Sequence, residues 1–283
     1  SVSCCLPVTE FTAPLPNTGT APGIQKHHRT WPNDGFDMLK ATSLNKSFGS
    51  LVVTDNVSLH VPAGGRHAVI GPNGAGKTTF FNLLTGEIKA NSGQVVIDGQ
   101  DISSASPDAR ARAGLGRSFQ KNNLFMEMTV LENLATASAV AMQLGKIFWK
   151  SFQTFSAVRQ AAEEIAGLVN LADVLKVPVK NLSYGHQRQL EVGLALATRP
   201  KVLMLDEPTS GMSPEETAVM LKLISSLPRT LTILIIEHDM EVVFGVTDRI
   251  TVLDYGSVLV EGTVEEVRNS EIVRQRYLGE AIS

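Results

Sequence analysis

The sequence predicts an α/β fold in which a block of helices interrupts a core of alternating strands and helices. An apolar, strand-like run at 66–70 leads through a glycine-rich loop into a helical run at 80–84. From about Met128 to Leu175 the chain is rich in Ala, Leu and Glu at helical spacing. Apolar runs of strand length then return, separated by helical stretches. These later runs lie at 202–205, 231–236, 250–253 and 258–260.

Composition limits the size of the fold and the kinds of partner. A chain of 283 residues with 43% hydrophobic residues can form one large α/β domain, or a domain with a subdomain. With a net charge of −3, the chain lacks the excess of basic residues typical of proteins that bind nucleic acid, so we expect no nucleic-acid partner. No apolar run approaches the roughly 18–20 residues that span a bilayer. Any membrane role is therefore expected to work through partners.

Residues 1–36 differ from the rest of the chain and are predicted to form a disordered tail. They are rich in proline, with scattered Thr, Gly and Asn and no sustained hydrophobic period. They also lack the basic start and apolar stretch of a signal peptide. Cys4 and Cys5 are the only cysteines and adjoin each other, so no disulfide framework is expected and a reducing compartment is favoured.

Short strands are expected between the tail and the glycine-rich loop. Residues 51–53 and 57–61 each suggest a strand, and Pro62-Ala63-Gly64-Gly65 marks the turn before the strand at 66–70. Residues 95–97, flanked by Gly93 and Asp98-Gly99, suggest another.

The glycine-rich loop at 71–79 fits the phosphate-binding pattern G-x-x-x-x-G-K-[ST], and it has the strand and helix that this motif requires. Its glycines allow the backbone N–H groups to turn inward around phosphate oxygens, and the following helix adds the positive end of its dipole. The lysine suits the β- and γ-phosphates, and the first threonine suits Mg²⁺. We therefore expect a nucleoside triphosphate to bind to Gly71, Pro72, Asn73, Gly74, Ala75, Gly76, Lys77, Thr78 and Thr79.

Two carboxylates, Asp206 and Glu207, end the apolar run at 202–205. Ligands of open α/β sheets bind at the carboxyl ends of strands, so Asp206 is expected to hold Mg²⁺ and Glu207 to polarise the water that attacks the γ-phosphate. Acids at a strand exit are common on protein surfaces. The phosphate loop upstream favours the catalytic interpretation.

Three further segments gain meaning from their order along the chain. Gln120 and His238 would each be ordinary polar residues if they stood alone. Between them Ser183 has the chemistry of a helix N-cap, and Gly185 allows close approach of a backbone. A helix start that offers a hydroxyl and free N–H groups suits a phosphate, although a plainly capped helix has the same pattern.

Taken together, these segments resemble the ATPase subunits of ABC transporters over nearly nine-tenths of the chain. The motifs that carry the resemblance follow in register. They are the Walker A loop at 71–79, the Q-loop residue Gln120, the signature at 182–187, the Walker B strand at 203–207, the D-loop at 210–213 and the switch residue His238. Phe48 stands where the family has an aromatic residue that stacks on adenine.

The resemblance implies a P-loop NTPase core with a mixed sheet over residues 37–283, an antiparallel β subdomain, and a helical subdomain at about 121–195. It also implies a head-to-tail dimer that holds two ATP molecules, so Ser183 and Gly185 would contact ATP bound to the partner. Glu207 would be the general base, and His238 would sense the γ-phosphate. Gln120 would contact Mg²⁺ and link it to the transmembrane partner.

Within the family, the chain resembles the LivG type, which serves importers of branched-chain or hydrophobic amino acids. The segments behind this assignment are 182–185, 211–214, 236–240 and 277–281. The resemblance implies a second, different ATPase in a heterodimer, two membrane permeases, a solute-binding protein, and a place on the cytoplasmic face of the plasma membrane. Importers of urea or short amides use similar ATPases. Tyr184, His186 and Ser213 depart from the usual family residues and leave some contacts with the partner's ATP open.

Other function classes fit less well. Soluble ABC ATPases that act on DNA or ribosomes usually carry long coiled coils or two ATPase units, and this sequence shows neither. A P-loop kinase would need no signature segment. The ATPases of lipopolysaccharide exporters are similar but usually have Gly at the position of Tyr184. In the family, residues after Gln120 border a groove for a permease helix, so Leu124, Phe125, Met126 and Met128 are expected either to form a docking surface or to belong to the core.

Overall fold

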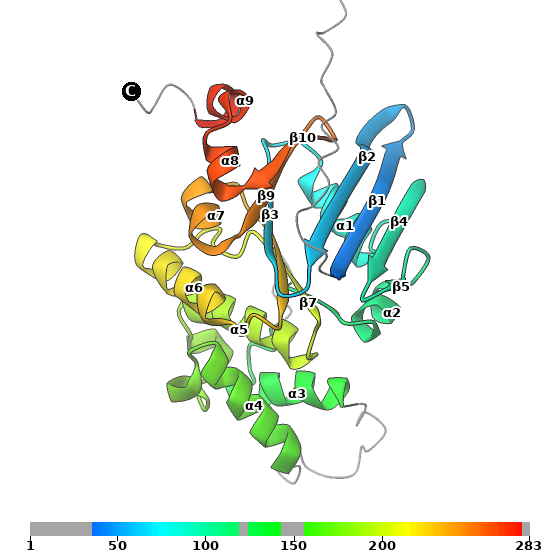
Figure 1. The fold of residues 1–283 in the computed structure, drawn as a ribbon. Helices are drawn as coiled ribbons and strands as arrows, with labels where there is room; N and C mark the ends of the chain where they lie inside the picture. The colour runs from blue at the N-terminus through cyan, green and yellow to red at the C-terminus, as the bar shows by residue number, and fades with distance from the viewer. Residues whose placement is uncertain (1–35, 119–123, 143–155, 279–283) are drawn as a thin grey trace, which may run out of the picture. The chain divides into compact units, whose positions relative to one another are not determined.

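The computed structural model describes residues 36–118, 124–142 and 156–278. The predicted tail up to residue 35 lies outside these ranges, as does Gln120. All the elements described below belong to one compact unit (Figure 1).

A six-stranded sheet forms the centre of this unit, in the order β10-β9-β3-β8-β7-β6. Neighbouring strands are parallel except for the antiparallel pair β9 and β10. The sheet is therefore mixed, as predicted. The strands are β3 (Arg66–Ile70), β6 (Leu115–Arg117), β7 (Val202–Asp206), β8 (Thr232–Ile236), β9 (Arg249–Asp254) and β10 (Ser257–Thr263).

A second sheet, antiparallel throughout, has the order β2-β1-β4-β5. The prediction of two separate strands at 51–53 and 57–61 was wrong, because β2 runs through both. Its polar interruption is an irregularity in the strand pairing, where Asn56 adopts φ 52° and donates its N–H to Asn45 Oδ1 at 2.8 Å. The strands are β1 (Asp37–Phe48), β2 (Leu51–Pro62), β4 (Ser92–Ile97) and β5 (Gln100–Asp101).

Helices flank the sheets, and α3, α4 and α5 gather at one end (Figure 1). The α-helices are α1 (Lys77–Thr85), α2 (Pro107–Arg112), α3 (Val130–Ala141), α4 (Ser156–Leu168), α5 (Tyr184–Ala197), α6 (Pro214–Ser226), α7 (Met240–Val246), α8 (Val264–Arg268) and α9 (Glu271–Val273). Shorter turns are η3 (Ala172–Val174), η4 (Val179–Asn181) and the π-helical η5 (Arg274–Leu278).

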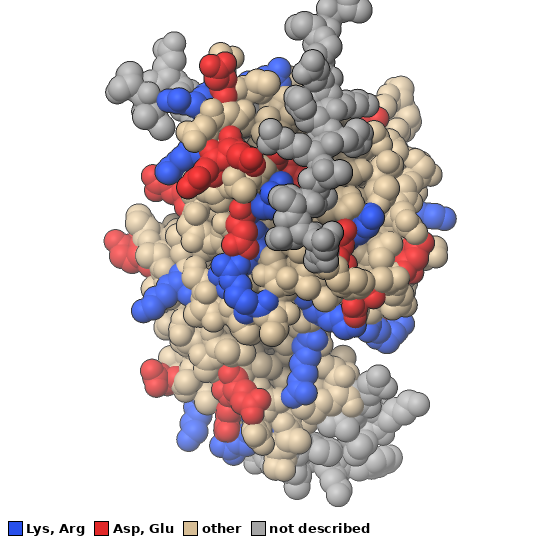
Figure 2. All heavy atoms as spheres, in the orientation of Figure 1, with Lys and Arg blue, Asp and Glu red and all other residues tan. Residues whose placement is uncertain are grey.

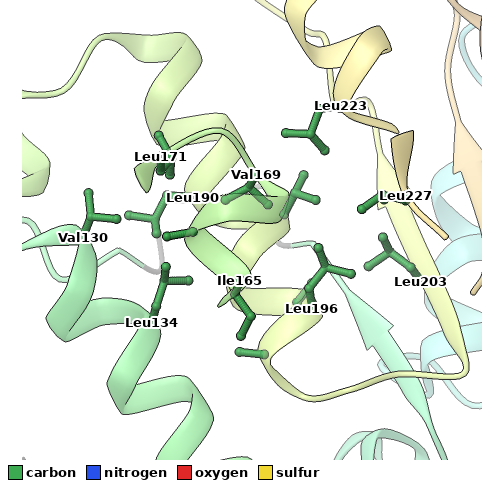
Figure 3. Close-up of a cluster of buried hydrophobic side chains, with 14 of the residues drawn as sticks. Val130, Leu134, Ile165, Val169, Leu171, Leu190, Leu196, Leu203, Leu223 and Leu227 are labelled. Atoms are coloured by element: carbon green, nitrogen blue, oxygen red, sulfur yellow. The ribbon is translucent and has the colours of Figure 1, made fainter. Parts of the chain in front are cut away.

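The strands of the central sheet bury both faces, which explains their continuous apolar runs. In β7, Val202 and Met204 pack with α1 and the antiparallel sheet, whereas Leu203 and Leu205 pack with the helical block. Burial of each such side chain stabilises the fold by about 1.5–3 kcal/mol. Figure 3 shows that the core of the helical block continues through α5 and α6 to Leu203, so the block is joined to the sheet that carries the acidic residues.

Glycine allows the helices of this block to approach closely. A Cβ atom on Gly193 of α5 would lie 3.1 Å from a methyl carbon of Leu134 on α3 and 3.3 Å from one of Val169. The missing side chain therefore lets α5 pack tightly against α3.

Within 36–118, 124–142 and 156–278, none of the helices combines the length and the hydrophobicity that crossing a bilayer requires. On the face shown in Figure 2, acidic and basic side chains are intermixed.

Candidate active site

The phosphate loop connects β3 to α1 and is packed against two other strands. Gly74 and Gly76 adopt φ 82° and 95°, in the left-handed region that glycine favours. A Cβ on Gly76 would lie 2.6 Å from the carbonyl oxygen of Val53 on β2, and one on Gly71 would lie 2.3 Å from that of Leu253 on β9. These glycines therefore serve both the curvature of the loop and its contact with the neighbouring strands.

The amino terminus of α1 has no side-chain cap. Its N-cap residue is Gly76, and no side chain accepts a hydrogen bond from its first turn. The helices α5 and α6, by contrast, are capped by the hydroxyls of Ser183 and Ser213. The first-turn N–H groups of α1 therefore lack the side-chain acceptor that other helices of this chain have, and an anion such as a phosphate can take that place.

Lys77 lies beneath the loop. Its Nζ donates to the carbonyl oxygens of Gly71 and Pro72, at 2.7 and 3.0 Å, and the side chain is buried. Burial lowers the pKa of Lys77, and the nearby Glu207 and Asp206 carboxylates oppose that shift. The ammonium is thus held by backbone oxygens of the phosphate loop itself.

Asp206, at the end of β7, is suited to a cation. The residue is only 6% exposed. Burial and then the adjacent Glu207 raise its pKa to about 6. An ionised carboxylate in this position is stabilised by a bound cation. Together with the Thr78 hydroxyl it offers the hard oxygen donors that Mg²⁺ prefers, so these residues fit the expected metal. The third expected ligand, Gln120, lies outside the described residues.

Glu207 directly follows β7 in an unusual backbone conformation. Its φ is 46°, in the left-handed region that residues other than glycine seldom adopt. Its N–H donates to the Ile236 carbonyl at 2.8 Å, which extends the pairing with β8 by one residue. The side chain of His238 comes close, with Nδ1 3.5 Å from Glu207 Oε1. The fold thus brings these two predicted residues together.

Sequence reasoning missed Glu237, which is fully buried beside them. Its Oε1 accepts hydrogen bonds from the N–H and hydroxyl of Thr209 at 3.2 and 2.5 Å, and its Oε2 accepts one from the His238 N–H at 3.0 Å. Glu237 therefore connects the loop after Glu207 to the segment of His238. Its only signal in the sequence is an acid placed directly after the apolar strand β8.

The helix α5 begins at the predicted signature segment. The Ser183 hydroxyl accepts from the His186 N–H at 3.2 Å, which confirms its capping chemistry. The Gly185 N–H donates to Glu216 Oε1 of α6 at 2.9 Å, a partner the sequence did not reveal. A hollow of about 170 Å³ lies between these helix starts. It is lined by Ser183, Gly185, His186, Gln189, Glu215, Glu216 and Val219.

The structure groups the predicted site residues in two places. The phosphate loop, Asp206, Glu207 and His238 are linked by the contacts described above. The contacts recorded for Ser183 and Gly185 run to α5 itself and to α6 instead.

Phe48 lies at the tip of the hairpin formed by β1 and β2, near Leu51 and Val52, and each of the three is at least 50% exposed. The ammonium of Lys46 is 5.0 Å from the Phe48 ring centroid. Val53 of β2, the other strand of this hairpin, touches Gly76, so the hairpin that carries the exposed ring is in direct contact with the phosphate loop.

Comparison with known proteins places this arrangement among characterised relatives. The family model described as ABC transporter matches residues 54–210. The High-affinity branched-chain amino acid transport ATP-binding protein LivG of Escherichia coli strain K12 is 39% identical over 252 residues, which cover 86% of this chain and 98% of that protein. The Lipopolysaccharide export system ATP-binding protein LptB of Haemophilus influenzae is 35% identical over 246 residues, covering 87% and 98%.

Solved structures show the same architecture. The ADP conformation of MJ1267, an ATP-binding cassette of an ABC transporter, superposes with a TM-score of 0.77 at 30% identity. The match covers 86% of this chain and 99% of that one. The predicted combination of a mixed sheet, an antiparallel sheet and an inserted helical block is therefore confirmed as that of a nucleotide-binding cassette.

Proposed function

Because this chain belongs to the ABC transporter family, as an ATP-binding subunit that hydrolyses ATP, we propose that it powers the uptake of branched-chain or other hydrophobic amino acids. The observation that carries this proposal is the 39% identity to LivG over almost the whole of that protein. The assignment as an ATP-hydrolysing subunit does not depend on which substrate is transported, since the phosphate loop and the acidic strand end serve ATP hydrolysis itself.

The phosphate loop and Lys77 would bind the triphosphate of ATP, and Phe48 would stack on the adenine. Thr78, Gln120 and Asp206 would hold Mg²⁺, which when bound neutralises charge on the phosphate oxygens. The contacts of Lys77 with Gly71 and Pro72 and the buried carboxylate of Asp206 support this assignment.

Glu207 would act as the general base. Its backbone is fixed by the hydrogen bond to Ile236, and its side chain is 35% exposed, so the carboxylate is oriented yet accessible to water. A positioned base contributes about 10²–10⁴-fold to a rate. His238, 3.5 Å away, would contact the γ-phosphate and respond to its loss. Strain at Glu207 supports a functional role, since such backbone conformations gather at active sites.

We further propose that the active unit is a head-to-tail dimer with a second, different ATPase subunit. The rim of the phosphate loop is exposed, including Pro72, Asn73, Gly74 and Thr78. Ser183 is exposed as well, at a capped helix start. Each surface would form half of an ATP site. The partner's signature segment would complete the site at this chain's phosphate loop, and this chain's signature segment would complete the site at the partner's phosphate loop. For Gly185 to contact that ATP through its N–H, the hydrogen bond with Glu216 must open.

Phe125 is our candidate for contact with a membrane permease, because its side chain is exposed while that of the preceding residue is buried in the core. Leu124 is 7% exposed and Phe125 is 56% exposed. The backbone of Phe125 is anchored by Asn133, which accepts its N–H at 2.9 Å and donates to its carbonyl at 3.1 Å. An exposed aromatic ring on an anchored backbone suits a docking contact. Two permeases and a solute-binding protein would complete an importer at the cytoplasmic face of the membrane.

The substrate can be tested by uptake in cells that lack this chain and are complemented with it. We expect wild-type protein to restore uptake of labelled leucine, isoleucine and valine, and the Glu207→Gln variant to fail while being present at the same level. The alternative is an importer of urea or a short amide, which the same cells test with labelled urea and acetamide. Restored urea uptake without leucine uptake would reject the amino-acid assignment and leave the ATPase assignment intact.

A further inference from the structure

Tyr184 is the first residue of α5, and its side chain reaches across to the loop that follows β7. The hydroxyl donates to the Ser210 carbonyl at 3.0 Å and accepts from Arg188 Nε at 2.9 Å. With one donor and one acceptor contact, the phenol is fully engaged although the residue is 43% exposed. Because its hydroxyl both donates and accepts a hydrogen bond, this tyrosine makes a specific contact although it is exposed.

Arg188 fixes the position of that phenol. Its guanidinium carbon is 5.3 Å from the Tyr184 ring centroid, and its Nη1 is paired with Glu191 Oε2 at 2.8 Å. Glu191 is only 8% exposed, so the pair is shielded from solvent. The guanidinium thus connects the phenol to a buried carboxylate on the same helix.

The facing loop is shaped to receive the ring. Gly211 adopts φ 78°, and a Cβ there would lie 3.4 Å from the Tyr184 hydroxyl oxygen and 3.5 Å from a ring carbon. The ring therefore lies against a glycine whose backbone conformation disfavours any other residue.

The contact leads directly to the proposed general base. The Ser210 N–H donates to the Glu207 carbonyl at 3.1 Å. Two hydrogen bonds in series, through Ser210, therefore join the Tyr184 hydroxyl to the backbone of Glu207. From the same helical turn of α5, the Gly185 N–H donates to Glu216 and so joins α5 to α6 as well.

We propose that Tyr184 is a positioning residue that couples the start of α5 to Glu207 within the same subunit. The inference rests on the proposed function, in which the start of α5 meets ATP held by a second ATPase subunit. When that ATP binds to the start of α5, the hydrogen bond from the Tyr184 hydroxyl to the Ser210 carbonyl transmits the movement of the helix start to the loop after β7. That movement aligns Glu207. Hydrolysis at this chain's phosphate loop then depends on ATP at the other site.

The test compares Tyr184→Phe with wild type in the complex purified through a tag on this chain. Removal of the hydroxyl should lower kcat for ATP about two- to tenfold, which corresponds to the loss of one hydrogen bond. The KM for ATP, the ATP affinity of the chain and its melting temperature should stay unchanged. Tyr255→Phe, the same chemical change at a tyrosine that is 88% exposed, is the matched control and should match wild type. An unchanged kcat, or a shared change in KM and melting temperature, would overturn the proposal.

Hydrogen exchange of the isolated full-length chain gives a second readout that does not depend on partners. In Tyr184→Phe, amides in the peptide covering 207–213 should exchange faster, while those of α1 should be unchanged. Equal exchange in that peptide would overturn the coupling. Glu207→Gln in the same complex separates the two hypotheses. If it abolishes turnover while Tyr184→Phe has no effect, only the coupling fails, whereas if Glu207→Gln retains turnover, the proposed function fails first.

Discussion

The Nδ1 atom of His238 lies 3.5 Å from Oε1 of Glu207, although the two residues follow different strands. The pairing of β7 with β8 explains this proximity, because Asp206 is opposite Ile236 at the ends of these parallel strands. Glu207 is one residue beyond that pair and His238 two residues beyond it. The register of the sheet therefore places the proposed base beside the proposed phosphate sensor.

Glu207→Gln tests the base. The substitution keeps the shape of the side chain and removes its ability to accept a proton, so ATP turnover in the complex should fall about 10²–10⁴-fold. Binding of ATP should persist, as measured with a fluorescent analogue. Glu271→Gln, an exposed residue of α9, is the matched control. Turnover within twofold of wild type would remove Glu207 from its role.

Lys77→Ala tests the phosphate loop. Lost charge-assisted contacts are worth about 1.5–3 kcal/mol each, so ATP affinity should fall about 10- to 100-fold or more. Calorimetric titration of the isolated chain measures it, with Lys222→Ala on the exposed side of α6 as control. Normal affinity in a folded Lys77→Ala variant would show that the lysine does not hold the triphosphate.

Phe125→Glu tests the permease contact. A charge on the exposed ring position should prevent assembly with membrane subunits, because burial of an unpaired carboxylate in an interface is costly. The isolated variant should keep its melting temperature and its affinity for ATP, since 56% of the residue is already exposed. Ile272→Glu, on α9 and 47% exposed, should assemble normally. If Phe125→Glu copurifies with the same subunits as wild type, the docking hypothesis fails.

The burial of His67 predicts that the free energy of unfolding depends on pH, independently of catalysis. It is buried on β3, and its Nε2 is 2.8 Å from the Thr251 hydroxyl. Burial, and then Arg249, lower its pKa to about 3 from an ordinary 6.5. The unfolded chain therefore binds more protons than the folded one between these values, so stability is full above pH 6.5 and is lost as pH falls below it.

Urea unfolding at pH 7.5 and pH 5 measures this effect. Wild type should lose about 2 kcal/mol more than His67→Gln between these conditions, because the variant has no proton to bind at that position. Equal losses in the two proteins would mean that the pKa of His67 is not lowered in the folded chain, so that the side chain binds its proton there as readily as in the unfolded chain.

The sequence was most informative where chemistry depends on local backbone. The phosphate loop needs only adjacent residues, and Asp206 and Glu207 follow from the rule that parallel strands present their carboxyl ends at one edge. His238 was expected from its order along the chain and from the family resemblance. The continuous strand β2 was predicted as two strands, because Asn is a residue typical of turns. The hydrogen bond of Asn56 with Asn45, which keeps this position within the strand pair, cannot be inferred from the sequence. An irregularity of this kind depends on the partner strand and leaves little local signal.

The supporting contacts of the site could not be predicted, because each joins residues far apart in the chain. Glu237 meets Thr209 across 28 residues, Glu216 meets Gly185 across 31, and Tyr184 meets Ser210 across 26. From the sequence Tyr184 was only a departure from the usual signature. In the structure its hydroxyl and ring have partners that a glycine could not contact.

Purification of this chain from gently solubilised native membranes, with its companions identified by mass spectrometry, tests the transport assignment directly. An ATPase subunit of an amino-acid importer should bring two permeases and a second, different ATPase, with a solute-binding protein that can then be screened for ligands. Recovery away from membranes, in association with nucleic acid or ribosomes, would contradict the transport assignment.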